Sequence, residues 1–201
     1  MNLWYIRNMT NARFKGLIFD MDGTLTIPTL DFNAMRNEIG LPEGDLAQEV
    51  FKLPPEKQQR AWEIIERHET QAIQDQRLQD NAEPFLARCR AADIKLGIVT
   101  RNERRSVDAL CAKYGLEFDS VVTREFQFIK PHPAPILHIL KQWNLPPHEV
   151  LMIGDYVHDI DCGRAAGTGT CFYHNQGSRY HGEDADFTAR SIDDLSEIVL
   201  G

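Results

Sequence analysis

A short apolar run near the start of the sequence stops abruptly at two aspartates. The stretch GLIFDMDGTLT places Asp20 and Asp22 one residue apart, directly after residues typical of a buried strand. A carboxylate at a strand end is held by the sheet while its side chain enters the crevice above it. Gly23 permits a sharp turn, so the N–H groups of Met21 and Asp22 are expected to point at an anion. Taken alone, however, Asp-x-Asp before glycine is most often a polar turn.

Two later segments carry side chains that can hold a phosphate. Thr100 closes a second apolar run in IVTRNE and is followed by Arg101. Thr100 to Glu103 also fits a helix-capping box, and the two readings are compatible because a helix N-terminus attracts anions. Lys130 stands in FIKPHPAP, where three prolines restrict the backbone and can hold an ammonium in place. Without that context, Lys130 would be read as a surface lysine.

A fourth segment adds further carboxylates. VLMIGDYVHDID ends an apolar run on Gly154 and Asp155 and places Asp159 four residues later, in the first turn of an expected helix. Acidic residues at that position also suit the helix dipole without any other role. Together with Asp20 and Asp22, however, Asp155 would complete an oxygen-rich cluster of the kind that holds Mg²⁺ with a substrate phosphate. The combination of segments, rather than any one of them, predicts phosphoryl chemistry.

The elements that must position these residues are apolar, β-rich runs separated by helical patterns. The expected strands are 14–19, 94–99, 118–122, 150–153 and 170–173. Strands that alternate with helices predict an α/β fold, a Rossmann-like parallel sheet with helices on both faces. Several of the runs end in polar residues, and the carboxyl edge of such a sheet is where ligands bind.

The segment 27–81 does not fit this alternation. It is far longer than an ordinary connection, yet its apolar residues recur at helical spacing, and Pro55 is placed to start a helix. We therefore expect a small all-α cap at 27–81, an α/β core at 14–26 and 82–201, and an N-terminal extension at 1–13. Four basic residues of the cap could meet a second anionic group on a substrate: Arg36, Lys52, Arg60 and Arg67.

Composition narrows the class of partner. The chain has 201 residues with 30 acidic and 22 basic side chains, a formal charge of -8, which is the wrong sign for binding a nucleic acid or an anionic membrane surface. The four cysteines are scattered without metal or disulfide spacing, and the apolar patch at 3–6 is too short for a signal peptide. We therefore expect a cytoplasmic protein that acts on a small molecule.

The motifs DMDGTLT, Thr100, Lys130 and GDYVHD, in this order, resemble the four motifs of the haloacid dehalogenase superfamily. The resemblance runs from about Phe14 to the C-terminus. Within the superfamily the chain looks like the phosphoglycolate-phosphatase-like hydrolases, whose helical cap follows the first motif, although the cap here is shorter than is usual. Tyr156 departs from the pattern, because the family often has a small residue after the Gly-Asp of the fourth motif.

The resemblance implies a reaction and a metal. Asp20 would attack phosphorus to form an aspartyl phosphate, and Asp22 would protonate the leaving oxygen and then activate water. Mg²⁺ would be bound by Asp20, the carbonyl of Asp22 and Asp155. Neutralisation is needed because a carboxylate and a single negative charge repel by about 4 kcal/mol at ~4 Å and an effective dielectric of ~20.

The resemblance also implies how the phosphate is held. The equatorial oxygens would be bound by side chains and by backbone N–H groups, namely Thr100, Arg101, Lys130, Met21 and Asp22. Asp159 would hold Lys130 or a metal-bound water in place. The predicted function is a magnesium-dependent phosphatase acting on a small-molecule phosphate monoester.

Other functions remain open at this point. Dehalogenases of the superfamily lack the second aspartate, so Asp22 favours phosphoryl chemistry. A sugar phosphomutase of the same superfamily is an alternative, although such enzymes usually carry Val where Thr24 stands. A receiver-like phospho-switch also gathers Asp, Thr and Lys at strand ends, but its acidic pair precedes a separate acceptor aspartate and it has no cap.

Overall fold

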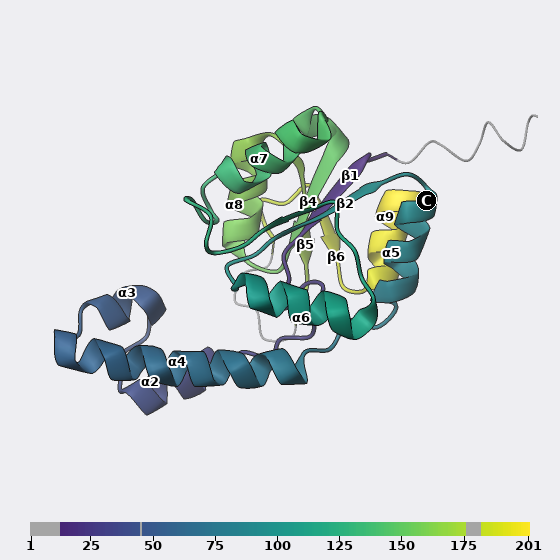
Figure 1. The fold of residues 1–201 in the computed structure, drawn as a ribbon. Coiled ribbons are helices and arrows are strands. Elements are labelled where there is room, and N and C mark those ends of the chain that lie inside the picture. The colour runs from purple at the N-terminus through teal and green to yellow at the C-terminus, as the bar shows by residue number, and fades with distance from the viewer. Residues whose placement is uncertain (1–12, 45, 176–181) are drawn as a thin grey trace, which may run out of the picture. The chain divides into compact units, whose positions relative to one another are not determined.

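The computed structural model describes residues 13–44, 46–175 and 182–201, so the expected extension at 1–13 lies outside them except for Arg13. Within these residues six strands form one sheet in the order β3-β2-β1-β4-β5-β6, and every neighbouring pair is parallel (Figure 1). The strands are β1 Gly16–Phe19, β2 Lys95–Val99, β3 Ser120–Val122, β4 Val150–Gly154, β5 Gly169–Tyr173 and β6 Phe187–Ala189.

Strand β1 is central because it is apolar on both faces. Phe19 pairs with Ile98 of β2 on one side and with Ile153 of β4 on the other. Leu17 and Phe19 enter one hydrophobic cluster and Ile18 enters another, and all three are fully buried. Each such burial contributes about 1.5–3 kcal/mol. The strand that carries Asp20 at its end is therefore firmly fixed.

Helices cover both faces of the sheet (Figure 1). One face packs against α5 Ala82–Ala91, α6 Arg104–Tyr114 and α9 Ile192–Leu200, through residues such as Phe85, Leu110 and Leu195. The other packs against α7 Ala134–Trp143 and α8 Val157–Ala166, through Ile139 and Cys162, with the short 3-10 helix Pro147–Glu149 between α7 and β4. The predicted Rossmann-like α/β fold is confirmed.

The sixth strand was not predicted. β6 consists of only three residues at the edge of the sheet, and it is paired with β5 alone. Its sequence, Phe-Thr-Ala, is too short to show alternation. Partnership with β5, rather than its own composition, makes it a strand.

A second compact unit comprises Pro28–Gln76, and its regular elements among the described residues are the helices α2 Phe32–Ile39, α3 Leu46–Phe51 and α4 Pro55–Asp75. Its core contains Met35, Val50, Ala61 and Ile65. Pro55 begins α4, as expected. The unit's role as a substrate-selecting cap, and the cap boundaries 27–81, remain predictions.

Three of the four basic residues singled out in this helical unit are engaged within it. Arg36 donates to the carbonyl of Gly44 and to the Asn33 side chain, Lys52 pairs with Glu49, and Arg67 pairs with Glu38; Arg60 is exposed on α4. Recruiting the first three to a substrate would require breaking these contacts.

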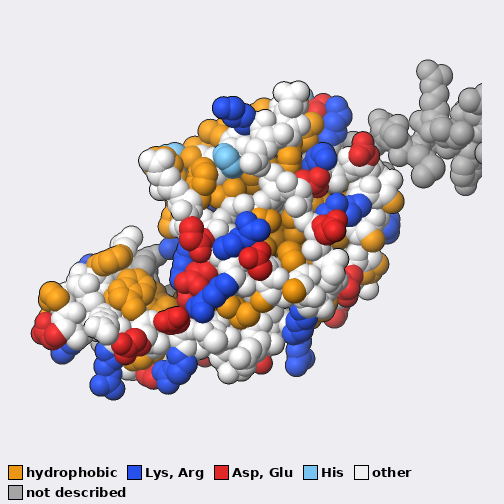
Figure 2. All heavy atoms as spheres, viewed as in Figure 1, with side chains coloured by type: hydrophobic (Ala, Val, Ile, Leu, Met, Phe, Trp, Pro, Cys, Tyr) orange, Lys and Arg blue, Asp and Glu red, His pale blue; other side chains and the backbone are white. Residues whose placement is uncertain are grey.

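Acidic and basic side chains are mixed over the face shown in Figure 2, which displays no continuous basic surface. Among the described residues, no helix combines the length and the apolar composition needed to cross a bilayer.

Candidate active site

The predicted site residues follow neighbouring strands at the carboxyl edge of the sheet. Asp20 follows β1, Thr100 follows β2 and Asp155 follows β4, and β1 lies between the other two. The ladder continues past the strand ends, because the N–H of Asp20 donates to Ile153 O at 2.8 Å and that of Thr100 to Val122 O at 3.0 Å. The backbone beneath both side chains is therefore held by the sheet.

Lys130 is the centre of a buried ion network. Its Nζ donates to Oδ1 of Asp20 and to Oδ1 of Asp159, each at 2.5 Å, and the residue is only 4% exposed. Burial alone would lower the pKa of Lys130, but the carboxylates of Asp159 and Asp20 outweigh it and raise the pKa. The alternative of a surface lysine is therefore wrong, and the ammonium is kept charged.

Asp159 is engaged through both of its oxygens. Oδ1 accepts from Lys130, and Oδ2 accepts from the N–H of Tyr156 at 3.0 Å, at the start of α8. The residue is 2% exposed. Because both oxygens are occupied, the geometry is suited to positioning Lys130.

Gly154 makes room for this arrangement. A Cβ at Gly154 would lie 2.2 Å from Cβ and Cγ of Asp159, far inside van der Waals contact. We expect Gly154→Ala to displace the Asp159 carboxylate, lower the free energy of unfolding by about 1–3 kcal/mol, and reduce kcat by more than its effect on stability explains. Urea unfolding and steady-state kinetics would measure both quantities.

Gly115→Ala is a matched control for that variant. Gly115 has φ +63° and nothing near its missing Cβ, at the end of α6, so alanine there is strained without touching the site. A Gly154→Ala protein that loses stability but keeps the kcat of the Gly115→Ala protein would contradict the expectation.

Asp155 is oriented by two side chains from other segments. Thr24 Oγ1 donates to its Oδ1, and Asn175 Nδ2 donates to its Oδ2, both at 3.2 Å. Gly23, at φ +91°, leaves space for the Asp155 carboxylate, since a Cβ at Gly23 would lie 2.4 Å from Oδ2 of Asp155. The glycine that permits the turn also admits the carboxylate.

Asp20, Asp155 and Asp159 form an acidic cluster in the described part of the chain, with carboxylate oxygens within 4.8 Å of one another. Burial raises the pKa of Asp20 to about 6, although Lys130 opposes this. Burial, followed by the charges of Asp20 and Asp159, raises the pKa of Asp155 to about 7. Crowded, desolvated carboxylates of this kind fit a divalent cation, which would relieve their repulsion.

The turn after Asp20 is organised by one carbonyl. Met21 O accepts from the N–H groups of Leu25 and Thr26, at 3.0 and 2.9 Å, and from the Thr26 hydroxyl at 3.1 Å. The N–H of Met21 bonds to the Asp20 carboxylate and lowers its pKa. Asp22 is half-buried, and its carboxylate is not part of the cluster of Asp20, Asp155 and Asp159. The metal ligand predicted at this position is its backbone carbonyl, not its side chain.

Thr100 does not cap a helix. Helix α6 begins at Arg104 after Glu103, which makes no side-chain cap, so the capping box predicted for Thr100 to Glu103 is wrong. The Thr100 hydroxyl instead accepts from the N–H of Asn102 at 3.1 Å. The residue is 4% exposed, and this bond leaves the hydroxyl proton as a donor.

Arg101 makes a contact that the sequence did not predict. Its Nη1 lies 3.3 Å from Nδ1 of His158, on α8, and the His158 ring packs edge-on against the ring of Tyr156 with centroids 4.9 Å apart. Arg101 and His158 are half-buried, whereas Tyr156 is 51% exposed.

Three contributing residues were missed from sequence: the hydroxyl of Thr24, the amide of Asn175 and the imidazole of His158. Thr24 and His158 lie inside motifs already singled out, so their position was the available signal. Asn175 lies two residues beyond β5, where asparagine is an ordinary loop residue, and only the fold brings it to Asp155.

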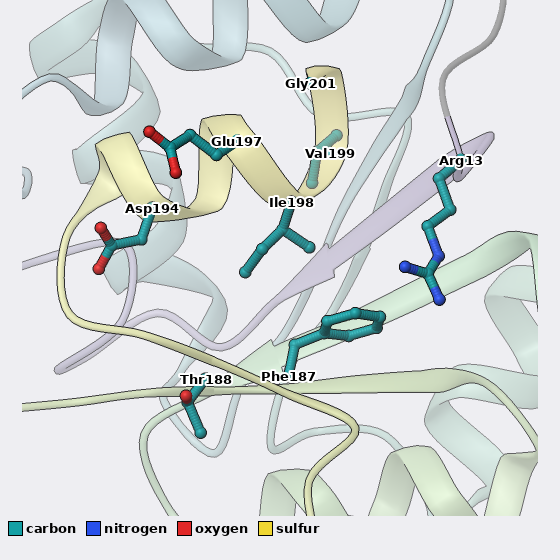
Figure 3. Close-up of a pocket in the computed structure, with 8 residues that line it drawn as sticks. All are labelled: Arg13, Phe187, Thr188, Asp194, Glu197, Ile198, Val199 and Gly201. Atoms are coloured by element: carbon teal, nitrogen blue, oxygen red, sulfur yellow. The ribbon is translucent and has the colours of Figure 1, made fainter.

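A separate cavity lies between α9 and Phe187 (Figure 3). Arg13 lies over the Phe187 ring, 4.5 Å from its centroid, and Asp194 and Glu197 of α9 add acidic side chains to the lining. None of the predicted site residues lines this cavity.

Comparison with known proteins places these features in context. Residues 26–173 match the family model of the haloacid dehalogenase-like hydrolases. A haloacid dehalogenase-like hydrolase domain-containing protein of Arabidopsis thaliana is 36% identical, over 94% of this chain and 84% of its own length. An N-acetylmuramic acid 6-phosphate phosphatase of Pseudomonas aeruginosa is 31% identical, over 81% of this chain and 82% of its own. The crystal structure of a predicted phosphoglycolate phosphatase from Haemophilus somnus superposes with a TM-score of 0.78 at 21% identity, covering 94% of this chain and 99% of that one.

Proposed function

Because the chain belongs to the haloacid dehalogenase-like hydrolases, we propose that it is a magnesium-dependent phosphatase that hydrolyses a small-molecule phosphate monoester through an aspartyl phosphate. The family and the phosphatase class predicted from the sequence motifs are confirmed. One observation carries the finer proposal: Lys130 joins Asp20 to Asp159 at the carboxyl edge of the sheet, beside Asp155.

Asp20 is the proposed nucleophile. Its carboxylate attacks phosphorus, and the bond from phosphorus to the ester oxygen breaks as Asp22 donates a proton to that oxygen. Asp22, now ionised, takes a proton from water. The resulting hydroxide attacks phosphorus, the bond to Asp20 breaks, and inorganic phosphate leaves.

The phosphate is held mainly by groups at the buried floor of the site. Thr100 and Lys130, each 4% exposed, would bind equatorial oxygens together with the N–H groups of Met21 and Asp22, and the Met21 N–H would exchange its bond to Asp20 for one to the phosphate. Asp159 fixes Lys130 through the contact described above. Arg101 was predicted with this group, but it is half-buried and contacts His158.

The metal would be held by Asp20, the carbonyl of Asp22 and Asp155, with Thr24 and Asn175 orienting Asp155. Bound there, Mg²⁺ supplies positive charge that offsets repulsion between the carboxylates and the phosphate dianion. The raised pKa values of Asp20 and Asp155 support this assignment, because burial and the neighbouring carboxylates disfavour the ionised forms, which a bound cation would stabilise. A Val at position 24, as in the phosphomutases, would remove one donor to Asp155.

The comparisons support a small phosphate monoester as substrate, since the Pseudomonas relative is a phosphatase of a sugar phosphate. Four free cysteines, three of them buried, support the proposal of a cytoplasmic enzyme.

Phosphate release from 4-nitrophenyl phosphate with Mg²⁺ tests the proposal. We expect many turnovers per chain, because the aspartyl phosphate is hydrolysed. A receiver-like switch would accept at most one phosphoryl group per chain, and a phosphomutase would interconvert sugar phosphates without net phosphate release. Either result would contradict the proposal. If phosphate is released over many turnovers, a screen of phosphorylated metabolites would identify the substrate.

A further inference from the structure

The contact between Arg101 and His158 crosses the end of the central strand. Arg101 follows β2, and His158 lies on α8 just after β4, and these two strands flank β1 on opposite sides. Neighbouring strands lie about 4.8 Å apart, so β2 and β4 are separated by roughly 10 Å. A side-chain contact of 3.3 Å between these segments must therefore span the crevice in which Asp20 lies.

The chemistry of this contact sets the state of the imidazole. A guanidinium has five N–H donors and no acceptor, so Nδ1 of His158 must be the accepting nitrogen. Arg101 thus brings a positive charge to this contact, and we call Arg101 and His158 together the rim of the site.

Burial separates this rim from the floor of the site. Asp20 is 8% exposed and Lys130 4%, whereas Arg101 and His158 are half-buried and so lie nearer to solvent. A phosphoryl group that reacts with Asp20 lies at the floor. The rest of the substrate would extend from this floor toward the more exposed Arg101 and His158.

We propose that Arg101, held by His158, is a specificity-determining residue that binds an anionic group, either a carboxylate or a second phosphate, on the leaving group of the substrate. The proposal rests on the phosphatase function proposed above. Guanidinium presents paired N–H donors that match the oxygens of carboxylate and phosphate. The neighbouring acidic cluster would otherwise repel such a group, and the positive charge of Arg101 would offset that repulsion. His158 is a positioning residue, which acts through Arg101.

Pairs of substrates in which a hydroxyl-bearing end replaces the second anionic group test this role. Phosphoglycolate is paired with 2-hydroxyethyl phosphate, and propane-1,3-diol bisphosphate with 3-hydroxypropyl phosphate. The readout is the ratio of kcat/KM within each pair. Both members are measured on one preparation, so the ratio does not depend on the fraction of protein that is folded.

We expect the wild-type enzyme to favour the anionic member of at least one pair, which identifies the source of the charge. Arg101→Gln should lower that ratio about tenfold or more, as expected for a lost hydrogen bond to a charged group. His158→Phe keeps a ring against Tyr156 but removes the acceptor, and should also lower the ratio. His158→Asn should restore it in part, since Oδ1 of asparagine can accept where Nδ1 stood.

Arg104→Gln is the matched control. It removes a positive charge three residues away, where the arginine pairs with Asp108 on the exposed surface of α6, and the ratio should stay at the wild-type value. Equal losses for both members of each pair in Arg101→Gln would show that Arg101 grips the transferred phosphate, and would overturn the proposal. A wild-type protein that hydrolyses none of these esters, nor 4-nitrophenyl phosphate, would instead overturn the phosphatase function.

Discussion

Replacing Asp20 by asparagine is expected to lower kcat by about 10⁴-fold or more, as removal of a nucleophile does in other covalent mechanisms. Asparagine keeps the size of the side chain and can still offer an oxygen to Lys130, which now bonds Asp20 at 2.5 Å. The fold should therefore survive while the attacking carboxylate is lost. No aspartyl phosphate should form with any substrate.

Asp22→Asn separates the two aspartates of the first motif. It should keep the nucleophile but impair protonation of the leaving group and activation of water. With an aryl phosphate, whose leaving group needs little protonation, the first step can proceed while hydrolysis stalls. Labelled phosphate should then accumulate on Asp20, as acid quench and peptide mapping would detect. Label on another residue, or near wild-type turnover by Asp20→Asn, would refute the assignment.

Removal of Mg²⁺ is expected to lower kcat/KM by about a hundredfold or more. A bound metal stabilises the charge of the transition state by several kcal/mol, and each ~1.4 kcal/mol changes the rate tenfold. EDTA should abolish turnover and Mg²⁺ should restore it. Asp155→Asn keeps the size of the side chain but removes its charge, and should weaken the response to Mg²⁺. Asp161→Asn, on the same helix as Asp159 but exposed, is the control and should keep it.

Thermal unfolding gives a readout of metal binding that does not depend on activity. Mg²⁺ at 100 times its Kd should stabilise the wild-type protein by about 2.7 kcal/mol. The same Mg²⁺ should give the Asp155→Asn protein a smaller shift in Tm. Full activity in EDTA, or an unchanged Tm shift in Asp155→Asn, would remove the metal from this mechanism.

The effect of Mg²⁺ should also depend on pH in a defined direction. The pKa values of Asp20 and Asp155 rise from 3.8 to about 6 and about 7 on folding, so the metal-free folded state holds extra protons in this range. The free energy of unfolding of the metal-free protein should therefore fall as the pH rises from about 4 to 7. Since Mg²⁺ binds the ionised carboxylates, its Tm shift should grow over the same interval.

The α/β fold could be predicted because buried parallel strands are apolar throughout and end in polar residues. The run that ends at Asp20 shows this pattern, and the structure places that strand at the centre of the sheet. Lys130 could be singled out by the prolines around it. Its burial and its two carboxylate partners could not be read from the sequence, because Asp20 and Asp159 are brought to it only by the tertiary fold.

Sequence patterns gave wrong predictions where the same pattern is compatible with two local structures. Thr100 to Glu103 matches a capping box, yet the helix starts later and the hydroxyl closes a short turn. In α2 the apolar spacing also overstated burial, because Phe32 is 47% exposed while Met35 enters the core of the small helical unit and Ile39 packs against it. The Arg101 contact with His158 joins two motifs, and nothing in either motif alone indicates it.

The strand order also has a consequence for how the chain folds. β1 is made first among the strands, but its two neighbours, β2 and β4, follow only after the helical unit and, for β4, after most of the core as well. During synthesis Leu17, Ile18 and Phe19 thus remain without the partners that bury them. Such distant pairings have a high contact order, which slows folding and leaves apolar side chains and unpaired strand edges exposed to aggregation. A chaperone that binds short apolar segments would therefore find a site on β1, directly before Asp20, until β2 and β4 have been made.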